Sequence, residues 1–152
     1  MNKIESKSQL ISNLSIGEKN STDYRIGTEH EKFVFNLQSK KPIHYDEENG
    51  ISSLLTKLKD FGWEPINEDD RVIALSRKNA NGGGSITLEP AGQFELSGEM
   101  FVSVHETYNE LVEHKAQISK IGKTMGIDFL ALGFAANWSR EDMPVMPKSR
   151  YE

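Results

Sequence analysis

Residues 27–35 read GTEHEKFVF, and this stretch sets the frame for the rest of the chain. Its strongly apolar second half predicts a β-strand, in which successive side chains point to opposite faces of a sheet. One face then carries Glu29, Glu31, Phe33 and Phe35, and the other carries His30, Lys32 and Val34. The two glutamates would stand roughly 6–7 Å apart, so they need either open water or a positive charge between them.

A second acidic stretch, residues 84–98, reads GSITLEPAGQFELSG. As two short strands, it places Glu89 and Glu95 on polar faces whose opposite sides are apolar. The chain then holds four carboxylates on three strand segments, those of Glu29, Glu31, Glu89 and Glu95. Carboxylates suit Mg²⁺ or Mn²⁺, and nucleotide-dependent phosphoryl transfer is the natural chemistry of such a cluster. A sheet with one wet face would show the same pattern without any metal.

The surrounding sequence predicts an α+β domain with a mainly antiparallel sheet and flanking helices. Apolar residues at helical spacing predict helices over residues 5–16, 51–61 and 102–125. Short apolar runs predict strands over residues 63–68, 71–78 and 85–90. The last two strands form a hairpin through the connector NANGGG, residues 79–84. The near-continuous apolar run IDFLALGFA, residues 127–135, predicts a central strand.

Composition narrows the class of protein. The chain has 152 residues, a net charge of −5 and no cysteine. The acidic balance excludes nucleic acid as a main partner, and no apolar run approaches the length that crosses a membrane. Without cysteine there can be no disulfide and no thiolate metal site within these residues, which fits a reducing compartment. A cytoplasmic location is therefore predicted.

Three segments together resemble one enzyme family. They are RIGTEHEKFVF, SITLEPAGQFELSG and MGIDFLALGFAANWSREDMPVMPKSRYE. In this order they resemble the plant-type glutamate–cysteine ligases, which are also common in proteobacteria, and the likeness runs from about Leu10 to Glu152. The chain differs at Val34 and Ala91, where the family usually has glycine, and neither position is acidic.

The resemblance implies a fold similar to the glutamine synthetase catalytic domain and an ATP-dependent ligation. The γ-carboxylate of glutamate would attack ATP, and the amine of cysteine would attack the resulting γ-glutamyl phosphate to give γ-glutamylcysteine, the first step of glutathione synthesis. Glu29, Glu31, Glu89 and Glu95 would then hold Mg²⁺ against the phosphates. The resemblance also implies that residues 1–152 are the N-terminal part of a single catalytic domain. The remainder would be absent, or supplied as a separate chain, and this part alone would be inactive.

Three other side chains are candidates for binding substrate. Arg140 and Arg150 follow the last apolar run, where an arginine could clamp a carboxylate with two hydrogen bonds. Gln93 shares the face of Glu95. Each has a simpler interpretation as a solvated loop charge or a polar sheet residue. His105 and His114, on the predicted long helix, are expected to face solvent.

Two other functions stay open at this stage. The chain could belong to another carboxylate–amine ligase of the same fold that makes a different γ-glutamyl product. It could also be an inactive metal-binding fragment or subunit that pairs with a second chain.

Overall fold

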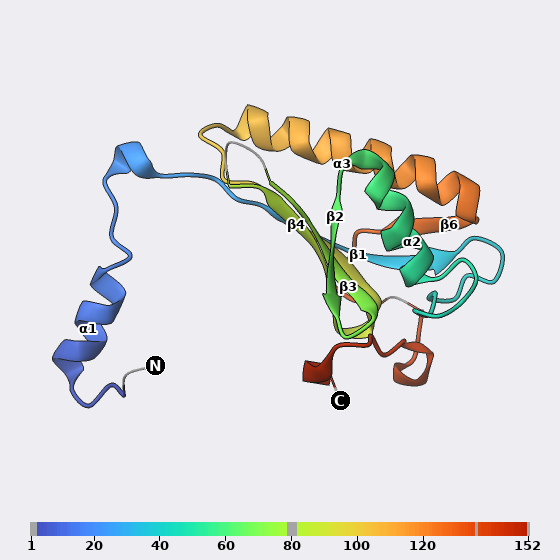
Figure 1. Cartoon of the computed structure of the whole chain (residues 1–152), viewed down its shortest axis with the longest axis horizontal. Helices are drawn as coiled ribbons and strands as arrows, with labels where there is room; N and C mark the ends of the chain where they lie inside the picture. The colour runs from blue at the N-terminus through green and yellow to red at the C-terminus, as the bar shows by residue number, and fades with distance from the viewer. Residues whose placement is uncertain (1–2, 79–81, 136, 152) are drawn as a thin grey trace.

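The computed structural model describes residues 3–78, 82–135 and 137–151. These residues form an α+β structure with three α-helices and an antiparallel sheet, which confirms the predicted class (Figure 1). The helices are α1 (Lys7–Ser15), α2 (Ile51–Leu58) and α3 (Val104–Met125). The strands are β1 (Glu29–Asn36), β2 (Glu64–Glu68), β3 (Arg71–Arg77), β4 (Gly84–Glu89), β5 (Gln93–Ser97) and β6 (Ile127–Leu130).

The order of the strands in the sheet is β2-β3-β4-β5-β1-β6, and every neighbouring pair is antiparallel. The predicted hairpin is confirmed as β3 and β4, although residues 79–81 of its connector lie outside the described residues. The strand that carries the first two glutamates, β1, lies between β5 and β6. The acidic stretches of β1, β4 and β5 are therefore adjacent in the sheet.

The prediction of a central strand over residues 127–135 is wrong. Only Ile127–Leu130 form a strand, and this strand lies at one edge of the sheet. Its apolar character comes from contact with α3 on one side, because Phe129 packs against the core. Beyond Leu130 the chain leaves the sheet, and Phe134 is largely exposed. An apolar run alone did not distinguish an edge strand followed by a loop from a longer buried strand.

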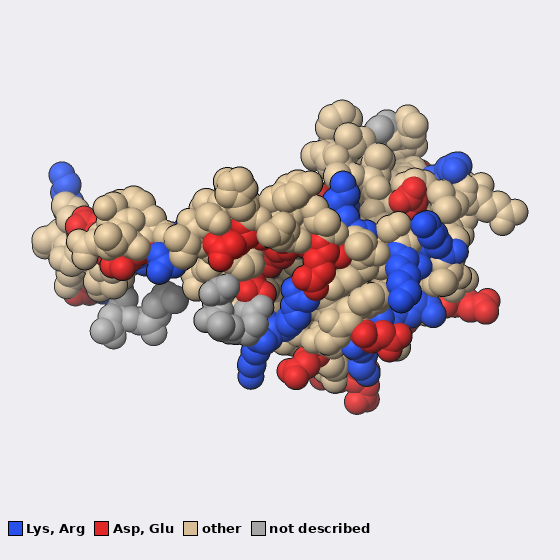
Figure 2. Space-filling view, turned by 90° about the horizontal axis from the view of Figure 1, so that it is seen from above, with Lys and Arg blue, Asp and Glu red and all other residues tan. Residues whose placement is uncertain are grey.

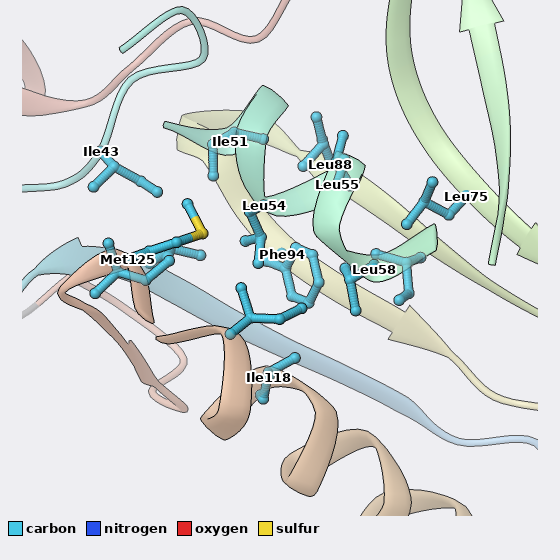
Figure 3. Close-up of a cluster of buried hydrophobic side chains, with 14 of the residues drawn as sticks. Ile43, Ile51, Leu54, Leu55, Leu58, Leu75, Leu88, Phe94, Ile118 and Met125 are labelled. Atoms are coloured by element: carbon cyan, nitrogen blue, oxygen red, sulfur yellow. The ribbon is translucent and has the colours of Figure 1, made fainter. Parts of the chain in front are cut away.

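Helices α2 and α3 lie over the same face of the sheet (Figure 1). Alternation along the strands supplies the other side of the core, since Ile86, Leu88, Phe94 and Leu96 all point toward the helices. Leu54, Leu55 and Leu58 of α2 are fully buried between this face and α3 (Figure 3). Trp63 is buried beside them, and its Nε1 donates a hydrogen bond of 3.0 Å to Gln117 Oε1 of α3.

Helix α3 has clear signals at both ends. Ser103 forms a capping box with Glu106, in which Glu106 Oε2 accepts from the Ser103 amide at 3.0 Å. At the other end Gly126 has φ 69°, a left-handed conformation that glycine adopts without strain. The helix therefore stops there, and the chain turns directly into β6.

Helix α1 lies away from the rest of the molecule and is joined to it by an extended segment (Figure 1). The sequence predicted this helix, and a capping box between Ser6 and Gln9 begins it. It has no buried residue, and its apolar side chains Leu10, Ile11 and Leu14 are exposed. The rest of the fold is therefore built without contributions from α1.

The face of the molecule seen in Figure 2 carries both acidic and basic side chains. Among the residues that the structure describes, no helix has the length and apolar character needed to cross a bilayer.

Candidate functional site

The four predicted acids share one face of the sheet, on the side away from α2 and α3. In the β1–β5 pair Glu31 stands opposite Glu95, and in the β4–β5 pair Glu89 stands opposite Gln93. The neighbours of Glu95 along β5, Phe94 and Leu96, point into the core, so Glu95 points the other way. We call the surface formed by Glu29, Glu31, Thr87, Glu89, Gln93, Glu95 and Ser97 the acidic face.

Glu95 is the most enclosed of the four acids, with 8% of its surface exposed. Two hydroxyl groups donate to its carboxylate, Thr87 Oγ1 at 3.0 Å and Ser97 Oγ at 2.8 Å. These donors hold the carboxylate at a fixed place in the middle of the sheet. Glu29 and Glu31 are exposed, so their carboxylates stay in water.

Glu89 is held by the C-terminal segment. Arg150 forms an ion pair with it at 2.7 Å, and the Tyr151 hydroxyl lies 3.4 Å from its second oxygen. Lys148 and Tyr151 also donate to the backbone oxygen of Leu88, at 2.6 and 3.3 Å. Sequence reasoning paired no basic residue with these acids and gave Arg150 to a substrate. In this structure Arg150 instead neutralises one of the proposed metal ligands.

The remaining substrate-binding candidates lie near the same end of β4 and β5. Gln93 Nε2 donates a long hydrogen bond of 3.4 Å to the Pro90 oxygen. Arg140 begins a short 3-10 helix, Arg140–Asp142, and lines a cavity of about 300 Å³ together with Ala91 and Tyr151. Arg140 is exposed and forms no ion pair with any described residue, so its guanidinium is available to a ligand.

Trp138 covers the other end of the acidic face. Phe33 and Phe35 continue the face beyond Glu31, and the ring of Trp138 lies 5.8 and 6.1 Å from theirs. Its Nε1 donates to the Lys40 backbone oxygen at 2.8 Å. The acidic face is thus bordered by an aromatic cluster on one side and by basic residues on the other.

The acidic face has the type of ligand that Mg²⁺ prefers, but its carboxylates are not gathered into a complete metal-binding cluster. Within residues 3–78, 82–135 and 137–151, no three His, Cys, Asp or Glu side chains are grouped closely enough to hold a metal ion. The register places one pair of these residues directly opposite each other, Glu31 and Glu95. Two carboxylates are a usual protein contribution to Mg²⁺, which completes its shell with water and phosphate oxygens. The residues therefore fit the ion in type and number.

The helix side of β1 holds titratable groups that sequence reasoning did not identify. His114 of α3 was expected to face solvent, but only 2% of its surface is exposed. Its ring stacks on Phe94 at 5.9 Å, and neither ring nitrogen has a hydrogen-bond partner among the residues that the structure describes. Burial, with the nearby positive charges of Lys32 and Arg77, lowers the pKa of His114 to about 3. The imidazole is therefore neutral at physiological pH.

Lys32 is also buried, with 6% of its surface exposed. Its Nζ donates to the His30 backbone oxygen at 2.8 Å. Burial lowers the pKa of Lys32 to about 8, with Lys115 acting in the same direction and Glu95 opposing them. The spacing of α3 held a signal for this region, because His114 lies four residues before Ile118 and seven before Ile121, on the buried stripe of the helix.

The fold and the site define an α+β protein that presents carboxylates on an open antiparallel sheet, with arginines at one end. Comparison with known proteins makes the class specific. The chain belongs to the glutamate-cysteine ligase family 2 (GCS2), whose sequence profile matches residues 25–152.

Curated relatives carry the same family name. The chain is 44% identical over 147 residues to a chloroplastic glutamate–cysteine ligase of Arabidopsis thaliana, covering 96% of this chain and 27% of the relative. It is equally similar to the chloroplastic enzyme of Medicago truncatula and to glutamate–cysteine ligase A of Oryza sativa subsp. japonica, with 28% of each covered. The chain thus spans little more than a quarter of the length of these relatives.

These relatives correct one expectation. A cytoplasmic location was predicted from the absence of cysteine, but all three relatives are named as chloroplastic proteins, which contradicts it. The inference failed because a cysteine-free composition reports only that no disulfide is present, and several compartments meet that condition.

Proposed function

We propose that this chain is the N-terminal part of an ATP-dependent ligase that joins the γ-carboxyl group of L-glutamate to the amine of L-cysteine. The observation that carries the proposal is 44% identity over 96% of the chain to an Arabidopsis glutamate–cysteine ligase. The product would be γ-glutamylcysteine, formed through γ-glutamyl phosphate. A catalytic sheet like that of glutamine synthetase is part of the same proposal, and the antiparallel sheet described above is compatible with it.

The acidic face supplies the phosphate-handling part of this reaction. Mg²⁺ or Mn²⁺, when bound there, would neutralise the phosphate oxygens of ATP and of the acyl phosphate. Glu31 and Glu95 would hold the ion, because they face each other across β1 and β5. Glu29 and Glu89 would complete the ligand set, Glu89 after its ion pair with Arg150 opens.

The arginines and Gln93 would bind the anionic substrate. Arg140 is free to accept a carboxylate, and Arg150 would become free when Glu89 turns to the metal. A guanidinium group can bind a carboxylate through two parallel hydrogen bonds, which fixes its orientation as well as its position. Gln93, opposite Glu89, can donate its amide to the same ligand.

The test is ADP release by the natural gene product that contains these residues. Release should require glutamate, cysteine and Mg²⁺ together, and mass spectrometry should find γ-glutamylcysteine. Glu31→Gln should lower the rate by orders of magnitude, because the charge on the transferring phosphoryl group loses an anchor. Glu47→Gln, an exposed loop change, is the matched control. Equal rates with glycine or 2-aminobutyrate in place of cysteine would favour another γ-glutamyl ligase.

An assay of the isolated 152-residue chain tests the remaining alternative, that the chain is an inactive metal-binding fragment or subunit. We expect it to release no ADP, since it spans little more than a quarter of the relatives' length. Full activity of this chain alone would overturn the fragment proposal. Failure of the natural gene product to turn over, with Mg²⁺ binding preserved, would favour a metal-binding subunit instead.

A further inference from the structure

A cavity of about 550 Å³ opens between the first half of β1, the middle of α3 and the residues around the end of β6. It exists because β6 is short. The pairing of β6 with β1 covers only Phe33–Asn36, so the described residues leave Glu29–Lys32 without a strand on that side. The cavity occupies the space beside this open edge.

The walls of the cavity combine apolar surface with basic groups. The apolar side chains come from α3, β6 and the following loop, and they are Leu111, Ile118, Phe129 and Leu132. The basic and hydroxyl groups are His30, Lys32, Lys115 and Ser119. Pockets for small organic molecules have this composition, with a mainly apolar lining and a few polar groups that fix orientation.

Lys32 and His30 have unused hydrogen-bonding capacity at this place. An ammonium group has three donors, but within the described chain the one acceptor of Lys32 is the neutral backbone oxygen of His30. The buried Nε2 of His30 likewise has no hydrogen-bond partner in the described part of the chain. Glu95 attracts the Lys32 ammonium through space, but no ion pair joins these two described residues, so part of the cost of burying the charge remains. An anion in direct contact with Lys32 Nζ would reduce that cost.

We propose that this cavity binds a small aliphatic monocarboxylate. Its carboxylate would accept hydrogen bonds from Lys32 Nζ and His30 Nε2, and its alkyl chain would lie against Leu111, Ile118 and Phe129. Three acidic residues also line the cavity, Glu29, Glu31 and Asp128. Their negative charges repel any anion, so a carboxylate is favoured only in direct contact with Lys32, and a second carboxylate on the ligand is disfavoured.

This site adjoins the acidic face, because Glu29 and Glu31 line the cavity as well, but the groups that would hold the carboxylate lie on the other side of β1. Lys32 and His30 point to the helix side of β1, whereas the proposed phosphoryl transfer takes place on the opposite side. The inference therefore does not depend on the proposed ligase reaction. Binding can be measured on the 152-residue chain with no substrate present.

The experiment is an NMR titration of the chain with sodium pentanoate, observed through its four histidine rings. His30 should shift saturably, and His114, which packs near it, should follow. His44 and His105 are exposed and serve as internal references. Pentylamine, which has the same alkyl chain and the opposite charge, should cause no saturable shift. Equal shifts with both compounds would show that only apolar contact is involved, and the proposal would fail.

Two variants make the test specific. Lys32→Met keeps an unbranched side chain that is one atom shorter and removes the ammonium group. It should weaken pentanoate binding about tenfold or more, as expected for loss of a charged hydrogen bond. Lys57→Met, an exposed change on α2, should bind like the parent chain. Ser119→Tyr narrows the cavity from an exposed position on α3 and should also block binding. Unchanged affinity in both Lys32→Met and Ser119→Tyr would overturn the site.

Discussion

Glu31 of β1 and Glu95 of β5 stand directly opposite each other across an antiparallel pair of strands. Like charges in this position destabilise a sheet by about 0.2–1 kcal/mol. The structure reduces the cost unequally: hydroxyl groups of Thr87 and Ser97 donate to Glu95, while Glu31 remains in water. The chain thus keeps a repulsive pair at the centre of its sheet, where an apolar or neutral pair would be more stable.

The opposed Glu31 and Glu95 allow Mg²⁺ binding to be tested through the thermal stability of the chain, without an enzymatic assay. Glu31→Gln should stabilise the 152-residue chain by roughly 0.2–1 kcal/mol in the absence of divalent ions, because one member of the repulsive pair becomes neutral. Mg²⁺ should raise the melting temperature of the parent chain and have little effect on the variant. Thermal melting with EDTA and with Mg²⁺ checks both statements. If Mg²⁺ stabilises the two proteins equally, Glu31 is not a ligand.

Replacing Lys32 with methionine should stabilise the chain at pH 7. The side chain is buried and charged there, and exchange of buried ionic groups for apolar ones often gains about 1–4 kcal/mol. Burial lowers the pKa of Lys32 to about 8 from 10.5, so between these values the unfolded chain still holds a proton that the folded chain has lost. Stability from Lys32 therefore rises with pH across this window. The advantage of the variant should shrink from pH 7 to pH 10, as followed by urea unfolding.

His114 should make the chain sensitive to mild acid. Burial lowers its pKa to about 3 from 6.5. As the pH falls below 6.5, the unfolded chain gains a proton that the folded chain does not accept until about pH 3, so stability is lost in this interval. His114→Leu should flatten the fall in stability between pH 6.5 and pH 4. His105→Leu, an exposed change on the same helix, is the control and should leave the curve as it is.

Removing residues up to Ile16 should leave the stability of the sheet and of its two packed helices within about 0.5 kcal/mol of the parent value. Helix α1 buries no residue, so its loss exposes nothing in the core. Binding of a hydrophobic dye should fall, since Leu10, Ile11 and Leu14 are exposed. Leu55→Ala, a change in the core, is the comparison and should lower the free energy of unfolding by about 2–5 kcal/mol. A comparable loss on truncation would show that α1 packs against the body in solution.

Much of the sheet could be predicted because strands repeat every two residues. Once β1, β4 and β5 were recognised, alternation placed Glu29, Glu31, Glu89 and Glu95 each on the polar face of its own strand. The register then shows that these polar faces form one side of the sheet. Helices α2 and α3 followed from apolar spacing, although α2 ends at Leu58 and a turn of 3-10 helix carries the pattern on to Phe61. These are local signals, each contained in a single segment.

The missed features depend on contacts between distant residues. Arg150 and Glu89 are 61 positions apart in the sequence, and no local sequence pattern predicts that they form an ion pair. The edge position of β6 depends on which strand it joins, which the apolar run does not encode. His114 is different, because its spacing from Ile118 already placed it on the buried stripe. There the prediction failed by weighing the polarity of the residue above its position.

The two tryptophans of the chain lie on opposite sides of the same sheet. Trp63 is sealed in the core with the Arg77 guanidinium 4.7 Å above its ring, whereas Trp138 lies half-exposed over Phe33 at the end of the acidic face. The chain therefore carries two native optical reporters in different surroundings. Trp138→Phe leaves an emission that follows the unfolding of the core, and Trp63→Phe leaves one that follows events on the open face. A nucleotide bound at the carboxylates would change the emission of Trp138 in the Trp63→Phe variant, and it would leave the emission of Trp63 in the Trp138→Phe variant unchanged.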